Sequence, residues 1–183
     1  AIAELGTTYK RTGFHFDKRL EKVEKKSKNI KYFKKNENLS FSDGKGGVVH
    51  KLIIGDNYDA LLNLLIEYRG KVDVIYIDPP YGKDSMGQFA DTNYDNSLTR
   101  DNLLSMLYPR LLLAKQLLSN EGVILCSIDD RNQAYVKCLF DEIFDEKNFV
   151  ANITWNKKSS AKGVPPKNMI VNVHEYILVY QKG

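Results

Sequence analysis

Two short apolar runs constrain the fold of this chain more than any other feature. Val72–Ile77 and Val123–Ile128 are rich in β-branched residues and almost uninterrupted in hydrophobicity, which is typical of strands buried on both faces of a parallel sheet. A helical pattern separates them over Thr99–Ser119, where Pro109 is expected to end the helix or kink one turn. Strands that alternate with helices of this length predict a doubly wound, mostly parallel α/β sheet.

Further elements continue this alternation. Leucines at helical spacing predict a helix over Asn57–Arg69, with Gly70 as its stop. The other elements are a helix over Arg131–Phe144 and strands over Leu52–Ile54, Phe149–Trp155 and Val173–Tyr180. The last two strands lack a connecting helix, so we expect an antiparallel hairpin at one sheet edge.

The N-terminal quarter of the chain is basic. The whole chain has a formal net charge of +4, yet residues 1–50 alone carry 12 Lys and Arg against 6 Asp and Glu. An apolar stripe within Lys18–Lys35 predicts a helix that begins near Asp17. This helix could be a solvated amphipathic helix or a face for a nucleic-acid backbone; charge runs more often simply face water.

A glycine-rich turn follows that helix. Leu39–Ser42 and Val48–Ile54 flank it and predict a hairpin or a short strand pair. We therefore divide the chain into a basic N-terminal helix and hairpin, residues 1–50, and an α/β unit, residues 51–183.

Composition excludes several classes of protein. The chain is 43% hydrophobic and 11% aromatic, which argues against disorder. Its two cysteines, Cys126 and Cys138, make neither a disulfide framework nor a zinc cluster, which predicts an intracellular, cytoplasmic protein with Cys126 as a small core residue. No apolar run approaches the roughly eighteen residues of a membrane helix. His15, His50 and His174 lack metal-ligand spacing, so no metal is predicted.

The motif that carries chemistry is Asp78-Pro79-Pro80-Tyr81, directly after the first buried run. Ligands of open α/β sheets bind at the carboxyl ends of strands. The motif suits methylation of an exocyclic amino group, because acceptors on both N–H bonds free a lone pair that is otherwise delocalised into the ring. Asp78 can supply one acceptor and the Pro79 carbonyl, held rigidly by two prolines, the other. Tyr81 offers a face on which a flipped base can stack. The structural alternative is a rigid turn whose Asp caps a neighbour and whose Tyr packs.

Several stretches together resemble a known family. Ile77–Tyr81, preceded by Gly55-Asp56, resembles the catalytic motif of amino-group DNA methyltransferases. Three further stretches make the set similar to the methylation (Mod) subunit of type III restriction–modification systems: Leu107–Leu111 with Ala114-Lys115, Gly122–Ile124 with Ser127–Asp130, and His174–Tyr180. The resemblance covers about residues 50 to 183.

The resemblance implies a Rossmann-like methyltransferase sheet and adenine-N6 methylation with S-adenosylmethionine, in a β-group order with the catalytic half first. It implies that Asp78, Pro79, Pro80 and Tyr81 hold the flipped adenine, and that methyl transfer is direct. Asp rather than Ser at the first motif position favours adenine over cytosine-N4. Asp56 and Asp78 would lie near the cofactor, although Asp56 could equally be a helix N-cap.

One family feature is missing from this sequence. The glycine-rich cofactor motif, Phe-x-Gly-x-Gly, has no match. We therefore expect a catalytic half-domain without its main cofactor site and its target-recognition region, with little activity alone. For the full-length protein the family implies double-stranded DNA, a restriction (Res) subunit and a second methylation subunit as partners, and no membrane.

Other residues have more than one interpretation. Lys157, Lys158, Lys162 and Lys167 are candidates for DNA contact. Asp129-Asp130 could line the cleft or cap the next helix. We expect a structural hydrogen bond for His174 and Glu175, and packing for Trp155.

Two alternative functions remain open. One is an amino methyltransferase acting on cytosine-N4 or RNA. The other is a non-catalytic module for nucleic-acid binding or subunit docking, with Lys25, Lys26 and Lys28 on its surface.

Overall fold

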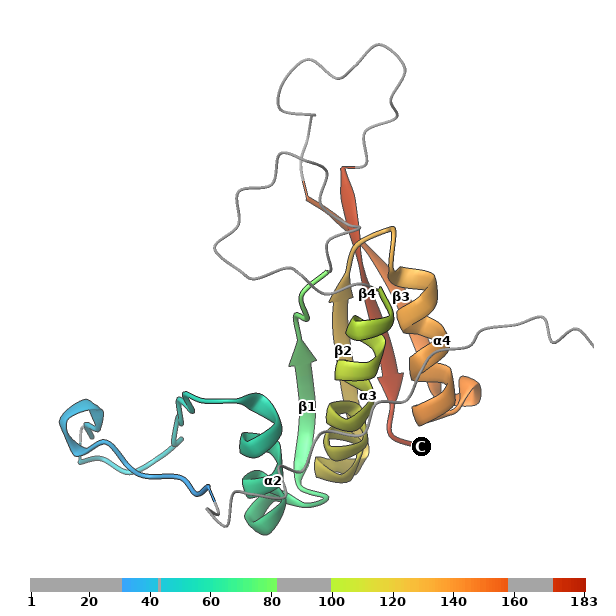
Figure 1. The fold of residues 1–183 in the computed structure, drawn as a ribbon. Helices are drawn as coiled ribbons and strands as arrows, with labels where there is room; N and C mark the ends of the chain where they lie inside the picture. The colour runs from blue at the N-terminus through green and yellow to red at the C-terminus, as the bar shows by residue number, and fades with distance from the viewer. Residues whose placement is uncertain (1–30, 43, 82–99, 158–172) are drawn as a thin grey trace, which may run out of the picture.

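A computed structural model describes residues 31–42, 44–81, 100–157 and 173–183. These residues build one sheet with helices packed on it (Figure 1). In chain order the elements are the 3-10 helix η1 (Glu37–Leu39), α2 (Asn57–Tyr68), β1 (Val72–Ile77), α3 (Arg100–Leu117), β2 (Leu118–Ile128), α4 (Gln133–Phe144), the 3-10 helix η3 (Glu146–Asn148), β3 (Phe149–Asn156) and β4 (His174–Gln181).

The sheet has the strand order β1-β2-β4-β3. β1 and β2 are parallel, and β4 is antiparallel to both of its neighbours. Therefore β1, β2 and β3 run in one direction and β4 in the other. In Figure 1 the arrow of β4 points opposite to those of β1 and β2. This confirms the predicted α/β sheet, mostly parallel with an antiparallel last strand and with the final hairpin at one edge.

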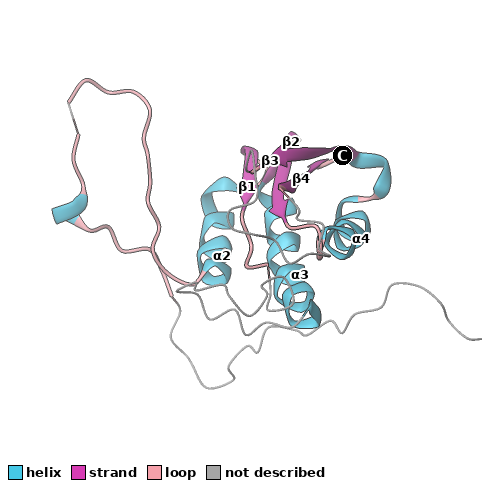
Figure 2. Cartoon of the chain, turned by 90° about the horizontal axis from the view of Figure 1, so that it is seen from above, coloured by secondary structure: helices cyan, strands magenta, loops and turns pink. Residues whose placement is uncertain are grey.

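The helices cover one face of the sheet. In Figure 2, α2, α3 and α4 all lie on the same side of the strands. The core between them is built from leucines of α3, apolar residues of α4 and alternate residues of β2 and β4. Tyr180 is 0% exposed, and its ring centroid lies 5.3 Å from that of Phe140, 6.2 Å from Phe144 and 5.2 Å from Phe149. Cys126 is also 0% exposed, so its prediction as a core residue is confirmed.

The opposite face of the sheet is apolar and exposed. Tyr76 pairs with Leu125 across the β1–β2 register and is 56% exposed, and Ile153 of β3 is 44% exposed. Within the described residues, no helix covers this face (Figure 2). The strands therefore have the two-sided hydrophobicity of buried parallel strands. Of the doubly wound arrangement that was predicted, the described residues show the helices of one face only.

The predicted helices and strands after residue 56 are confirmed with small changes at their ends. Of the two effects expected of Pro109, an end of the helix is contradicted, because α3 continues through this position to Leu117; a kink there stays a prediction. β2 begins earlier than predicted, because Leu118 pairs with Val72 before an irregularity that ends at Val123. In that irregular stretch, a Cβ on Gly122 would lie 2.8 Å from the carbonyl oxygen of Val72, so the close approach of the backbones requires glycine.

The predictions for the N-terminal segment are wrong where the structure describes it. Residues 31–35, the described part of the helix expected over Lys18–Lys35, are irregular. The hairpin over Leu39–Ser42 and Val48–Ile54 does not form, and the strand at Leu52–Ile54 is absent too. Leu52 and Ile54 are 87% and 84% exposed. These residues have strand-forming side chains, but no described strand lies beside them to accept their backbone hydrogen bonds.

None of the helices in the described ranges combines the length and apolarity needed to cross a membrane.

Candidate active site at the carboxyl edge of the sheet

The Asp78–Tyr81 motif leaves the sheet where β1 ends, as predicted. Asp78 is exposed, Pro79 is buried, and Pro80 and Tyr81 are half-buried. Tyr81 packs against the hydrophobic core. The proline-rich turn is therefore anchored in the protein while its carboxylate faces outward.

Ser127 of β2 holds the Asp78 side chain. The Ser127 hydroxyl donates to Asp78 Oδ1 at 2.9 Å and lies 3.4 Å from the carbonyl oxygen of Ile77. The parallel register pairs Ile77 with Cys126, so Asp78 and Ser127 follow side by side on neighbouring strands. Ser127 is only 7% exposed, which shelters this hydrogen bond from competing water.

The Tyr81 hydroxyl belongs to the same group of side chains. Burial raises the pKa of Tyr81, Ser127 opposes the rise, and the negative charge of Asp78 adds to it. The hydroxyl therefore stays protonated at neutral pH and can act as a donor. The turn is also held through its backbone, because Asn132, 1% exposed, donates from Nδ2 to the Tyr81 carbonyl oxygen at 2.6 Å.

The turn after β2 adds carboxylates to this edge. Asp129 Oδ1 accepts from the backbone N–H of Asn132 at 3.1 Å, and the Asp129 carbonyl accepts from Gln133 N at 3.0 Å. Asp129 thus holds the turn that leads into α4, whose N-cap residue is Asn132 rather than either aspartate. Burial raises the pKa of Asp129, and the Asn132 N–H opposes the rise.

β4 begins at the same edge because it runs antiparallel. His174 Nε2 lies 3.0 Å from the Tyr176 hydroxyl, and Glu175 forms an ion pair with Lys157. Both contacts fit the structural hydrogen bonds expected for these residues.

The predicted DNA-contacting lysines are mostly beyond the structural description. Lys158, Lys162 and Lys167 lie outside the described residues. Lys157 is half exposed and has its charge matched by Glu175. Trp155 was expected to pack against other side chains. It is 59% exposed on the edge strand β3, so among the described residues this prediction is wrong.

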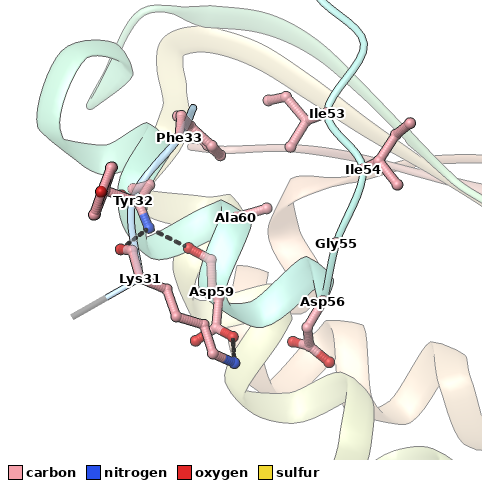
Figure 3. Close-up of a pocket in the computed structure, with 10 residues that line it drawn as sticks. Lys31, Tyr32, Phe33, Ile53, Ile54, Gly55, Asp56, Asp59 and Ala60 are labelled. Carbon is pink, nitrogen blue, oxygen red and sulfur yellow. Dashed lines mark hydrogen bonds and ion pairs between the residues drawn. The ribbon is translucent and has the colours of Figure 1, made fainter. Parts of the chain in front are cut away.

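Asp56 lies at a separate hollow near α2. Its side chain caps α2 by accepting from Tyr58 N at 2.8 Å, and Arg110 Nη2 lies 3.8 Å from its Oδ1. The hollow has a volume of about 380 Å³ between residues 31–33, residues 53–56 and the start of α2 (Figure 3). Asp56 lines it and Asp78 does not. The structure therefore does not bring the two predicted cofactor residues into one pocket.

Two supporting residues of the site, Ser127 and Asn132, were not predicted from the sequence. Ser127 stood in one of the motif stretches without an assigned role. The alternation of side chains along the second buried run could have indicated it, because this alternation places Ser127 next to Asp78 on the neighbouring strand. Asn132 had no signal in the sequence, because its contact with Tyr81 depends on the path of the turn after β2.

Comparisons of sequence identify the family of the chain. Residues 72–183 match a family model described as DNA methylase, N6 and N4 methyltransferases. A second model, for an uncharacterised conserved protein, matches residues 4–74. The StyLTI Mod subunit of a type III restriction–modification enzyme from Salmonella typhimurium is 37% identical over 158 residues, covering 73% of this chain and 24% of that protein. The type II methyltransferase M.KpnI from Klebsiella pneumoniae is 36% identical, covering 80% of this chain and 35% of that protein.

Solved structures share the fold. A DNA modification methylase from Thermus thermophilus, described as putative and complexed with S-adenosyl-L-methionine, superposes with a TM-score of 0.52 at 18% identity, covering 73% of this chain and 55% of that one. The sheet is thus of the Rossmann-like methyltransferase type.

The chain spans about a quarter of the length of the Mod subunits it matches. Its family model nevertheless matches more than half of the chain and includes the whole Asp78–Tyr81 motif, with every strand of the sheet. The chain therefore belongs to the DNA methylase family.

Proposed function

We propose that this chain carries the amino-group site of a DNA methyltransferase that methylates adenine at N6 with S-adenosylmethionine, within a type III restriction–modification system. Membership of the DNA methylase family and the similarity to Mod subunits support the proposal. The observation that carries it is the exposed Asp78 carboxylate at the carboxyl end of β1, held by Ser127 and adjoined by Tyr81.

The proposed chemistry uses Asp78 as a hydrogen-bond acceptor. One carboxylate oxygen accepts an N–H of the adenine amino group, and the Pro79 carbonyl accepts the other. Because both N–H bonds are then directed to fixed acceptors, the nitrogen lone pair turns out of the ring plane and becomes nucleophilic. With a methyl donor bound, the N–C bond would form as the sulfonium–methyl bond breaks and the donor leaves as a neutral thioether, and the amino group would then release one proton to water. No covalent enzyme intermediate would be needed.

The prolines and Tyr81 serve this geometry. Pro79 is buried and Pro80 half-buried, so the turn keeps one backbone conformation while the base arrives. Tyr81 is anchored through its carbonyl by Asn132, and its half-buried ring offers its remaining surface to the base.

S-adenosylmethionine supplies an electrophilic methyl group on a sulfonium when it is bound. The hollow at Asp56 fits the nucleoside part of such a molecule: its volume lies in the range of small-molecule sites. Ile53, Ile54 and Phe33 offer apolar contact to a purine, and Asp56 can accept hydrogen bonds from ribose hydroxyls. We propose that Asp56 holds the nucleoside. Asp78 does not line this hollow, and we propose that it faces the methyl-bearing end of the cofactor, which would extend beyond the hollow.

The remaining assignments concern partners. We propose double-stranded DNA as substrate, with Lys157, Lys158, Lys162 and Lys167 near its backbone, and a Res subunit and a second methylation subunit as partners of the whole protein. Residues 51–183 remain our proposed catalytic half, with residues 1–50 as the separate basic segment.

Nucleoside analysis tests the proposal. The protein is expressed from the complete reading frame that encodes this chain, in a host without its own DNA methylation, and the DNA is digested for mass spectrometry. We expect N6-methyladenine. N4-methylcytosine instead would favour the second candidate, since the family model covers both N6 and N4 methylation. Absence of both marks would refute a DNA methyltransferase function.

A further inference from the structure

We propose that Ser127 is a positioning residue that sets the orientation of the Asp78 carboxylate toward the amino group. This inference rests on the proposed function. Its basis is the hydrogen bond from the Ser127 hydroxyl to Asp78 Oδ1 at 2.9 Å, formed by a side chain that is only 7% exposed.

The register of the two strands explains why a serine lies at this place. Ile77 pairs with Cys126, and Cys126 is fully buried in the core under the helices. Alternation along β2 therefore directs Ser127 to the opposite face, next to Asp78, which follows Ile77. Its hydroxyl also lies 3.4 Å from the Ile77 carbonyl oxygen, so it contacts the last residue of β1 as well as the first residue of the motif.

This contact limits how the carboxylate can turn. Asp78 is exposed, and a free aspartate side chain rotates about two bonds. A donor fixed on Oδ1 determines the plane of the carboxylate, and with it the direction in which Oδ2 presents its lone pairs. The amino group of the base needs an acceptor that points toward its N–H bond, because a shift of a catalytic group by about 1 Å can lower the reaction rate about 100-fold. Ser127 thus acts on the reaction through Asp78.

The same strand pair contains a matched control. Ser119 of β2 donates to Asp73 Oδ1 of β1 at 3.0 Å, which is the same pair of residue types on the same two strands. That contact lies at the other end of β1, where Val72 pairs with Leu118, away from the motif. Ser119→Ala therefore removes a hydrogen bond between the same residue types, in a more exposed position, without touching Asp78.

The experiment measures steady-state methylation kinetics of the full protein, with rates divided by the concentration of active sites. The variants are Ser127→Ala, Ser127→Cys, Ser127→Thr and Ser119→Ala. We expect kcat to fall about 10- to 100-fold in Ser127→Ala, with KM for DNA and for S-adenosylmethionine unchanged. Ser127→Cys has almost the volume of serine but a weak donor, so it should fold and show a similar loss. Ser127→Thr keeps the hydroxyl and should recover most of the rate.

A purely structural role predicts another pattern. It would lower the fraction of active protein while the rate per active site stayed normal, and Ser119→Ala would behave like Ser127→Ala. Either result, or a wild-type kcat in Ser127→Cys, overturns the inference. If Ser127 variants are normal while Asp78→Ala is inactive, only this inference fails. If Asp78→Ala is fully active, the proposed function fails with it.

Discussion

Replacing Tyr180 by phenylalanine removes one hydroxyl from the aromatic part of the core and leaves its ring in place. The hydroxyl donates to Asp141 Oδ1 at 2.5 Å, and Lys137 Nζ contacts the same carboxylate at 2.8 Å and 3.0 Å. Both the burial of Tyr180 and this hydrogen bond raise the pKa of Tyr180, so the donor is intact at neutral pH.

The expected cost follows from these contacts. A hydrogen bond to a charged acceptor contributes about 1.5–3 kcal/mol. The Asp141 side chain is 25% exposed and keeps Lys137 as a partner, so water can replace part of the lost contact. We therefore expect the free energy of unfolding to fall by about 1.5 kcal/mol, which corresponds to about 3–6 °C in Tm for a chain of this size.

Urea unfolding followed by circular dichroism at neutral pH measures this loss. Tyr76→Phe is the matched control, because Tyr76 is 56% exposed on the uncovered face of the sheet, and its effect should stay within about 0.5 kcal/mol. A loss below about 0.5 kcal/mol in Tyr180→Phe would refute the reasoning, since it would mean that the buried hydroxyl adds no net stability.

Three further predictions concern the same sheet and core. Gly122→Ala should lower the free energy of unfolding by about 1–3 kcal/mol in urea titrations, because the added Cβ would lie 2.8 Å from the Val72 carbonyl oxygen. Asn120→Ala, at an exposed position of the same strand, is the control and should leave the free energy of unfolding unchanged. Equal losses in the two variants would contradict the steric explanation. Phe140→Ala should cost about 3–5 kcal/mol in calorimetry, because the ring is 0% exposed, and a cost below about 1 kcal/mol would be inconsistent with the packing. Burial raises the pKa of the Cys126 thiol above its usual value of about 8.5, and the charge of a nearby carboxylate adds a smaller contribution. The neutral thiol therefore contributes its full stability below about pH 8.5, and this contribution is lost as the pH rises further. Urea midpoints between neutral pH and about pH 10 should therefore fall more steeply in the wild type than in Cys126→Ala, and equal slopes would argue against a thiol that stays neutral.

The parts of the fold that the sequence predicted well are those determined by local pattern. Val72–Ile77 was predicted with the bounds that β1 has, because a short β-branched run carries its own signal. The segment Val48–Ile54 carries similar residues and forms no strand, because a strand also needs a neighbour at its edge. Whether a neighbouring strand is present cannot be read from the residues of the segment itself.

The candidate site shows the same division. Asp78 and Tyr81 were predicted from the motif and its place after a strand. The hydrogen bond from Ser127 to Asp78 could not be predicted from the sequence, because it depends on the register between β1 and β2. For Asp56 the sequence left a helix cap and a cofactor contact open. The structure shows the cap, and it also places Asp56 at the edge of a hollow.

The central claim is that DNA methylation proceeds at the carboxyl end of β1 through Asp78. The most direct test is the rate of methyl transfer to DNA by the full protein carrying Asp78→Ala, compared with Asp73→Ala, which removes an exposed carboxylate from β1 itself. We predict a loss of at least about 100-fold for Asp78→Ala and a rate near wild type for Asp73→Ala. A rate for Asp78→Ala within about threefold of wild type would contradict it.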